Sequence, residues 1–154
     1  MTLTQKENLL LCDLKSQEQL CIDKYSKYEA SAKDPCLKNL FSTIKTTEQN
    51  HLSTINRILG GEEVSMNSSS GQSSNNTQNT QCQPSSVSAE DKQSDAFLCK
   101  DALAMEKHVS SVYDTAIFEF KSQTLRDTLN HIQKEEQNHG KDIYSYMAVN
   151  GMYS

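Results

Sequence analysis

The tetrapeptide Glu-Gln-Asn-His occupies residues 48–51 and recurs without change at residues 136–139. Each copy is preceded, 30 residues earlier, by another glutamate, Glu18 in the first case and Glu106 in the second. A constant shift of 88 residues therefore relates two parts of the chain, and a duplicated structural unit explains it. The same shift relates Asp13 to Asp101, Tyr25 to Tyr113, Leu37 to Leu125, Ile44 to Ile132 and Ile55 to Ile143.

The segments around the repeated residues have the spacing of amphipathic helices. Apolar residues recur at steps of three and four, and no segment shows a sustained alternation with period two. Helix-start signals stand at Thr4 and at Asp34-Pro35, and glycine-containing stops follow at 60–61 and 150–151. We therefore predict an all-α protein with one helical hairpin at 4–61 and another at 91–150. Its expected inward apolar residues are Leu11, Leu14, Cys21, Tyr25, Leu37, Phe41, Ile44, Ile55, Ile58, Ala102, Val109, Tyr113, Ala116, Phe120, Leu125, Leu129, Ile132, Ile143 and Tyr146.

A polar stretch separates the two hairpins. Residues 67–88 contain 18 Ser, Thr, Asn or Gln among 22 positions and no charged side chain. Such a composition offers too little apolar surface to offset the entropy of ordering, so we predict a disordered linker over 62–90. It is long enough to run the length of a four-helix bundle within a single domain over 1–154. A simple up-down-up-down bundle is the alternative, and it would not need so long a connection.

Composition excludes several other classes of protein. Five glycines and two prolines are too few for a turn-rich all-β fold, and no apolar run is long enough to span a membrane. A net charge of −5 without basic blocks gives no support for nucleic-acid binding. The five cysteines are an odd number without any Cys-x-x-Cys spacing, which argues against a zinc ribbon, a rubredoxin-type iron site or a secreted disulfide framework. Free thiols in a reducing compartment are the expected state.

Charged residues interrupt the apolar stripe of every predicted helix. Because an isolated buried carboxylate is very costly, inward-facing charges need a partner inside the protein. Glu and His at positions i and i+3 project from the same face of a helix and can reach one metal ion. Two such pairs with two further glutamates form the dinuclear ligand set of ferritin-like bundles, and two divalent cations neutralise the four carboxylates. The predicted ligands are Glu18, Glu48, His51, Glu106, Glu136 and His139.

Two alternatives to this interpretation stay open. The six residues could lie on exposed helix faces, or they could face inward and serve folding only, at a site that stands partly empty. We expect two divalent ions, with iron as the first expectation and manganese or zinc as alternatives, because carboxylate and imidazole ligands suit all three.

Residues near the predicted ligands receive weaker predictions. Tyr25 and Tyr113 follow the first glutamate of each half by two helical turns. We expect them to pack in the core, with a hydrogen bond to a ligand carboxylate as the alternative. Glu135 is offset by about 100 degrees from Glu136 and is expected outside the site. The unrepeated His108 and His131 are assigned no role.

Residues 3–14, 18–25, 113–121 and 150–153 resemble the spore coat protein F family of endospore-forming bacteria. The resemblance covers both helical halves and leaves out the linker. It implies membership of the ferritin-like superfamily, the same six metal ligands, and a coat or sporulation role in the mother cell and then in the spore coat. Other coat proteins are the partners that this role implies. A homodimer is a separate, open expectation, and composition leaves neither nucleic acid nor membrane among the expected partners.

The resemblance leaves two classes of function open. The first is a structural or assembly protein of the spore coat, whose bundle core holds the metal pair. The second is a di-iron or di-manganese oxidase or peroxidase, catalase-like or rubrerythrin-like, that protects the forming spore. Rubrerythrin-like relatives carry an additional glutamate one turn after the third-helix ligand, where this chain has Val109. They also carry a rubredoxin-type centre, for which the cysteines are missing. Whether the chain is an enzyme therefore stays undecided.

Overall fold

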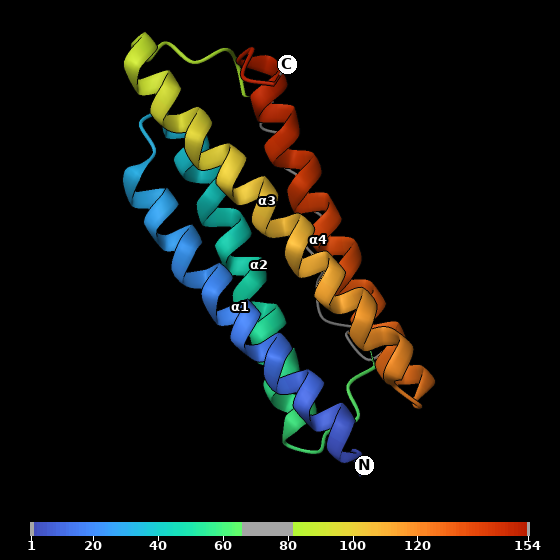
Figure 1. Cartoon of the computed structure of the whole chain (residues 1–154). Coiled ribbons are helices and arrows are strands. Elements are labelled where there is room, and N and C mark those ends of the chain that lie inside the picture. Colours follow the sequence, from blue (N-terminus) through green and yellow to red (C-terminus); the bar gives the residue numbers. More distant parts are fainter. Residues whose placement is uncertain (1, 66–81, 154) are drawn as a thin grey trace.

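A computed structural model describes residues 2–65 and 82–153, and within them the chain forms four helices and no strand (Figure 1). The predicted all-α bundle of two hairpins is confirmed. The helices are α1 (Gln5–Ser31), α2 (Pro35–Leu59), α3 (Ala89–Glu119) and α4 (Gln123–Val149).

The helix ends follow from local sequence. Thr4 and Glu7 form a capping box at the start of α1, in which each side chain binds the other residue's backbone N–H. Asp34 caps α2 ahead of a proline in its first turn. Beyond α2 and α4, Gly61 and Gly151 adopt φ values of 90° and 63°, a left-handed conformation that other residues rarely take.

The order of helix directions requires a long crossover. Helix α1 packs against α2 and α3, and α4 packs against α3 and α2. In Figure 1, α2 and α3 run in the same direction, and each is antiparallel to its hairpin partner. The chain leaves α2 beside the first turns of α4, where Thr128 donates a hydrogen bond to the carbonyl of Val64 (2.8 Å). It returns at the other end of α4, where the backbone N–H of Ser85 donates to Asn150 (2.8 Å). The up-down-up-down alternative is wrong.

The core lies along the bundle axis and is built from the predicted stripes. Every apolar residue that the helical spacing places inward is buried, with an exposure of 3% or less. Burial of a large apolar side chain stabilises a fold by about 1.5–3 kcal/mol, so these stripes supply most of the driving force for folding. Further buried apolar residues are Tyr28, Ala32, Val64, Cys99, Met105 and Met147.

Each hairpin turn is held by an acidic residue of the other hairpin. The backbone N–H groups of Lys33 and Asp34 donate to the carboxylate of Asp95 (2.8 and 2.9 Å), which is fully buried. At the opposite end of the bundle, the N–H of Lys121 donates to Glu7 (3.1 Å). The shift of 88 residues maps Glu7 onto Asp95 and Lys33 onto Lys121, so the duplication extends to the turns. The two hairpins are therefore locked together at both ends.

The flanks of the predicted linker depart from the expectation of disorder. Residues 66–81 lie outside the described residues, but Val64, Cys82 and Ser85 on either side contact the bundle, and α3 already begins at Ala89. Cys82 forms a disulfide with Cys36 in the first turn of α2, with Cα atoms 6.1 Å apart. The expectation of five free thiols is therefore wrong. Because 46 residues separate these cysteines, they meet only because residue 82 lies at the end of the bundle where α2 begins.

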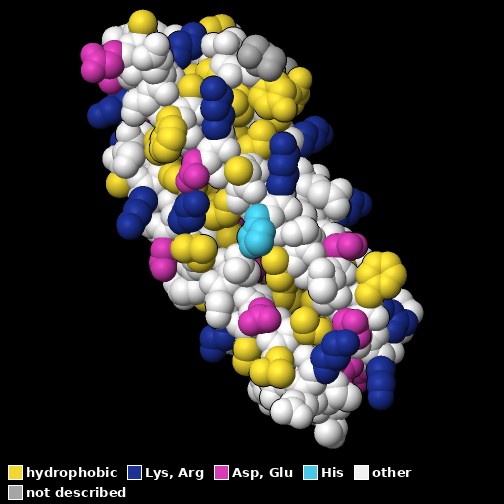
Figure 2. Space-filling model, in the orientation of Figure 1, with side chains coloured by type: hydrophobic (Ala, Val, Ile, Leu, Met, Phe, Trp, Pro, Cys, Tyr) yellow, Lys and Arg dark blue, Asp and Glu magenta, His cyan; other side chains and the backbone are white. Residues whose placement is uncertain are grey.

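The surface carries charges of both signs. Figure 2 shows Lys and Arg side chains interspersed with Asp and Glu over one face of the molecule, with hydrophobic side chains between them. No helix among the described residues is long and apolar enough to cross a membrane.

Candidate metal centre

The six predicted ligands meet halfway along the bundle, and all four helices contribute. Each is buried: the exposed fractions are 0% for Glu18, Glu48 and Glu136, 2% for His51 and Glu106, and 6% for His139. Helices α1 and α3 each provide one glutamate, and α2 and α4 each provide a glutamate and a histidine. The alternative that these groups lie on exposed helix faces is wrong.

The ligand atoms fall into two overlapping groups, each with its potential ligand atoms within 4.8 Å of one another. Glu48 and Glu136 belong to both groups and lie between them. We name the two groups by their histidines: the His51 position consists of Glu18, Glu48, His51 and Glu136, and the His139 position consists of Glu48, Glu106, Glu136 and His139. Two ions sharing two carboxylates would fit this arrangement.

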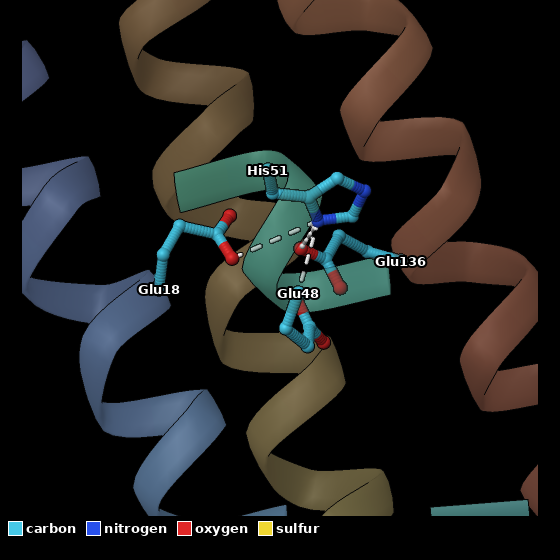
Figure 3. Close-up of side chains that lie close together, drawn as sticks. All are labelled: Glu18, Glu48, His51 and Glu136. Carbon is cyan, nitrogen blue, oxygen red and sulfur yellow. Dashed lines mark hydrogen bonds and ion pairs between the residues drawn. The ribbon is translucent and has the colours of Figure 1, made fainter. Parts of the chain in front are cut away.

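At the His51 position, three carboxylates converge on one ring nitrogen. Nδ1 of His51 lies 3.1 Å from Glu48, 3.2 Å from Glu136 and 3.7 Å from Glu18 (Figure 3). The other ring nitrogen points away from these three carboxylates. One nitrogen carries at most one hydrogen, so it cannot donate a full hydrogen bond to all three acceptors. A cation surrounded by all four groups would satisfy them together.

The His139 position repeats this geometry on the other side of the shared glutamates. Nδ1 of His139 lies 3.2 Å from Glu48, 3.2 Å from Glu136 and 3.5 Å from Glu106. The two imidazole rings are stacked with their centroids 6.0 Å apart. The duplicated sequence therefore produces two matching half-sites that face each other across the bundle axis.

Unsatisfied oxygens provide an independent test of the fit to metal ions. One carboxylate oxygen of each glutamate is buried without a hydrogen bond of good geometry among the described residues: Oε2 of Glu18, Oε1 of Glu48, Oε2 of Glu106 and Oε1 of Glu136. Of these, Oε1 of Glu48 and Oε1 of Glu136 each lie at ion-pair distance, 3.2 Å, from a histidine Nδ1 that other carboxylates share. Leaving a buried acceptor unsatisfied costs about 1–3 kcal/mol, and more for a charged group. Four such oxygens in one small volume fit a site that holds cations, because oxygen and imidazole donors are what iron, manganese and zinc accept.

Without metal, two of the four buried glutamates have raised pKa values and therefore tend to hold protons. Burial raises the pKa of Glu18 to about 8 and that of Glu106 to about 7, with further increases from neighbouring carboxylates. Burial also acts to raise the pKa values of Glu48 and Glu136, but hydrogen bonds with the histidines outweigh it and lower both.

Burial and the neighbouring carboxylates act on the pKa values of the two histidines in opposite directions. Burial acts to lower the pKa values of His51 and His139, but the surrounding carboxylates raise both well above the usual range. In the metal-free cluster, Glu18 and Glu106 therefore hold protons at pH values below about 7, and the two imidazolium groups then balance the carboxylates of Glu48 and Glu136.

Both tyrosines contact the cluster across the bundle. The hydroxyl of Tyr25 donates to Oε1 of Glu106, and that of Tyr113 donates to Oε1 of Glu18. Each tyrosine thus binds the glutamate of the other hairpin and leaves the second oxygen of that glutamate free to bind a cation. The expectation of core packing is correct for their rings, which are fully buried, and the alternative of a hydrogen bond to a ligand carboxylate also holds.

Glu135 belongs to the surroundings of the cluster, contrary to the prediction. Its carboxylate lies 2.7 Å from Nε2 of His51, the nitrogen that faces away from the cluster. The offset of 100 degrees from Glu136 directs Glu135 toward α2 instead of toward the bundle axis, because α2 packs against α4. The unrepeated His131, for which we predict no role, lies 3.5 Å from Glu135. His108 is exposed.

Residues 94–154 match the Coat F domain. The match covers most of α3 and all of α4, and therefore includes Glu106, Glu136 and His139. No match was found among curated proteins or among solved structures.

The Coat F domain match agrees with the resemblance seen in the sequence for the second hairpin. The shift of 88 residues maps residues 94–154 onto residues 6–66, so the matched segment corresponds to one unit of the duplication. The first unit carries the same three ligands, two glutamates and a histidine, at the same spacing. A site with six ligands therefore needs both units, and the second hairpin alone holds half of it.

Proposed function

We propose that this chain is a structural or assembly protein of the bacterial spore coat, and that its bundle, of the ferritin-like kind, holds two divalent metal ions. The Coat F domain match supports the coat role. The single observation that carries the metal site is the convergence of four buried glutamates with unsatisfied oxygens on two buried histidines. The six ligands of the proposed site are Glu18, Glu48, His51, Glu106, Glu136 and His139.

The arrangement gives each residue a distinct task. Glu48 and Glu136 would bridge the ions, because they belong to both groups of ligand atoms. Glu18 and Glu106 would each complete one position, oriented by a tyrosine of the other hairpin. Two divalent ions bring four positive charges, equal to the four negative charges of the carboxylates, so the filled core would be neutral. Cross-linking four helices through two ions would stabilise the bundle against unfolding in a coat layer.

A second candidate function is an oxidase or peroxidase with a di-iron or di-manganese centre. The favouring observation is the direct sharing of Glu48 and Glu136 between two adjacent positions. Two redox-active ions held in this way would supply electron transfer to dioxygen or peroxide. The chain's own contribution would be to exclude bulk water by burying all six ligands and to hold protons on the tyrosine hydroxyls beside Glu18 and Glu106.

One experiment tests the proposal and separates the two candidates. The native protein is extracted from the coat fraction of purified spores, its metal content per chain is measured, and the same sample is assayed for peroxide consumption. We expect the chain in the coat fraction with about two ions, with iron ahead of manganese and zinc. Its absence from that fraction would contradict the coat role, and its presence without metal would contradict the metal site. Sustained peroxide consumption would favour the enzyme.

The matched control is a pair of double variants expressed in the same cells. Glu48→Gln with Glu136→Gln removes both bridging charges and should reduce the metal content to background. Glu63→Gln with Asp142→Asn removes the same number of charges at exposed positions and should leave the metal content unchanged.

A further inference from the structure

The two halves of the candidate metal centre differ in one contact, although the repeat makes them alike in every ligand. Nε2 of His51 lies 2.7 Å from the carboxylate of Glu135. Under the shift of 88 residues, the counterpart of Glu135 is Thr47, which bears no charge. Among the described residues, none forms a hydrogen bond with Nε2 of His139. The repeat therefore provides an internal comparison in which only one histidine has a carboxylate on its outer nitrogen.

The other surroundings of the two histidines match. Each faces three ligand glutamates through Nδ1 at distances between 3.1 and 3.7 Å. Each position also includes a glutamate bound by a buried tyrosine. His51 is the more enclosed of the two, with 2% of its surface exposed against 6% for His139. The contact with Glu135 is thus the main difference in polar surroundings between the two positions.

A carboxylate on the outer nitrogen of a histidine affects the inner nitrogen in two ways. It accepts the Nε2 hydrogen, so the lone pair resides on Nδ1, and it holds the ring at a fixed angle. Its negative charge also makes Nδ1 a better electron donor to a cation. Glu135 extends from α4 to α2, so it additionally fixes the separation of the two helices that carry the bridging glutamates.

We propose that the two metal positions are unequal, that the His51 position binds its ion first and more tightly, and that Glu135 is the positioning residue responsible. This inference rests on the proposed dinuclear site. It adds an order of filling and names a residue outside the six ligands that sets this order. The His139 position, without such a carboxylate, takes up the second ion and releases it more readily.

The test is a titration of the metal-free full chain with Mn²⁺, in which the six-line electron paramagnetic resonance signal reports the free ion. The wild-type chain should bind two ions in two separable steps. Glu135→Ala should weaken the tighter step by about 10–100-fold, the range found when such outer partners of ligand histidines are removed. Glu135→Gln keeps an acceptor for the Nε2 hydrogen and loses the charge, so the affinity should fall between those of the wild type and the alanine variant.

Two further variants complete the comparison. Thr47→Glu places a carboxylate at the equivalent position of the first repeat and should tighten the weaker step. Asp142→Asn removes an exposed charge from α4 and should change neither step. Circular dichroism of each metal-free variant checks that it folds. If Glu135→Ala does not fold, the affinity of Glu135→Gln still tests the inference.

A second measurement separates positioning from general stability. In Zn²⁺-loaded protein labelled with ¹⁵N at histidine, the Nε2 hydrogen of His51 should exchange slowly with solvent and that of His139 quickly. Glu135→Ala should make His51 exchange quickly and leave His139 unchanged. Equal Mn²⁺ affinities in the wild type, or a tighter step that Glu135→Ala does not alter, would overturn the inference while leaving the dinuclear site intact. Failure of the wild-type chain to bind Mn²⁺ would instead contradict the site itself.

Discussion

Single hydroxyl groups orient the outer glutamates of the candidate centre. Tyr113 donates to Glu18, and both residues are fully buried. Removing the hydroxyl frees the carboxylate to rotate. It also removes a hydrogen bond that, once Glu18 is ionised on binding metal, goes to a charged group and is worth about 1.5–3 kcal/mol. Tyr113→Phe should therefore weaken the binding of the ion at the His51 position by about 10-fold or more. A Mn²⁺ titration of the metal-free variant, followed by the electron paramagnetic resonance signal of the free ion, would measure this loss.

The tyrosines offer their own controls. Tyr25→Phe should affect the His139 position instead, because Tyr25 binds Glu106. Tyr144→Phe removes a hydroxyl from a half-exposed ring on α4 and should change neither step. If Tyr113→Phe and Tyr144→Phe had the same effect on metal affinity, the hydrogen bond to Glu18 would have no role in binding.

At the level of helices and turns, the acidic residues that join the hairpins determine stability. Asp95 of α3 accepts two backbone hydrogen bonds from the turn between α1 and α2 and is fully buried. Asp95→Ala leaves two backbone N–H groups in the interior without acceptors, which should lower the free energy of unfolding by about 2–4 kcal/mol. Chemical denaturation of the two proteins would measure the difference.

Two variants calibrate this result. Asp95→Asn retains one good acceptor oxygen and should lose about half as much stability. Asp114→Ala, at an exposed position of the same helix, should change the free energy of unfolding by less than about 0.5 kcal/mol. A loss at Asp95 no larger than that at Asp114 would show that the turn does not depend on this carboxylate.

For the whole molecule, the buried cluster makes stability depend on pH and metal together. Without metal, Glu18 and Glu106 have folded-state pKa values of about 8 and about 7, above the unfolded value of 4.5, and the histidine pKa values are also raised. Groups with raised folded pKa values stabilise the fold below their unfolded pKa, and this stabilisation is lost as pH rises through the folded pKa. The melting temperature of chelator-treated protein should therefore fall between pH 6 and pH 9.

Metal should reverse this trend, because cations replace the protons that the cluster loses. The increase in melting temperature on adding Mn²⁺ should be small near pH 6 and should grow toward pH 8, since ligands must be deprotonated to bind. Differential scanning calorimetry with and without chelator would measure both effects. The double variant Glu48→Gln with Glu136→Gln should show no metal-dependent increase at any pH, and a full increase in that variant would contradict the assignment.

Much of this protein is determined by the sequence alone, because helical spacing and exact repetition are local properties. The stripes from Leu11 to Tyr146, the helix starts at Thr4 and Asp34, and the inward placement of the six candidate ligands all follow from residue type and position along a helix. Capping, burial of apolar surface and the cost of unpaired buried charge act on each helix in the same way wherever it packs.

Other features depend on which helices become neighbours, and only the tertiary structure decides them. Glu135 reaches His51 because α4 packs against α2, and Tyr113 reaches Glu18 because α3 packs against α1. Cys82 meets Cys36 because the segment before α3 lies at the end of the bundle where α2 begins. The sequence indicates one pair of such contacts. The shift of 88 residues relates the acids Glu7 and Asp95, and each of them binds the turn of the other hairpin. Contacts between distant segments depend on how the helices are placed relative to one another, and the spacing of residues along a single helix does not predict that placement.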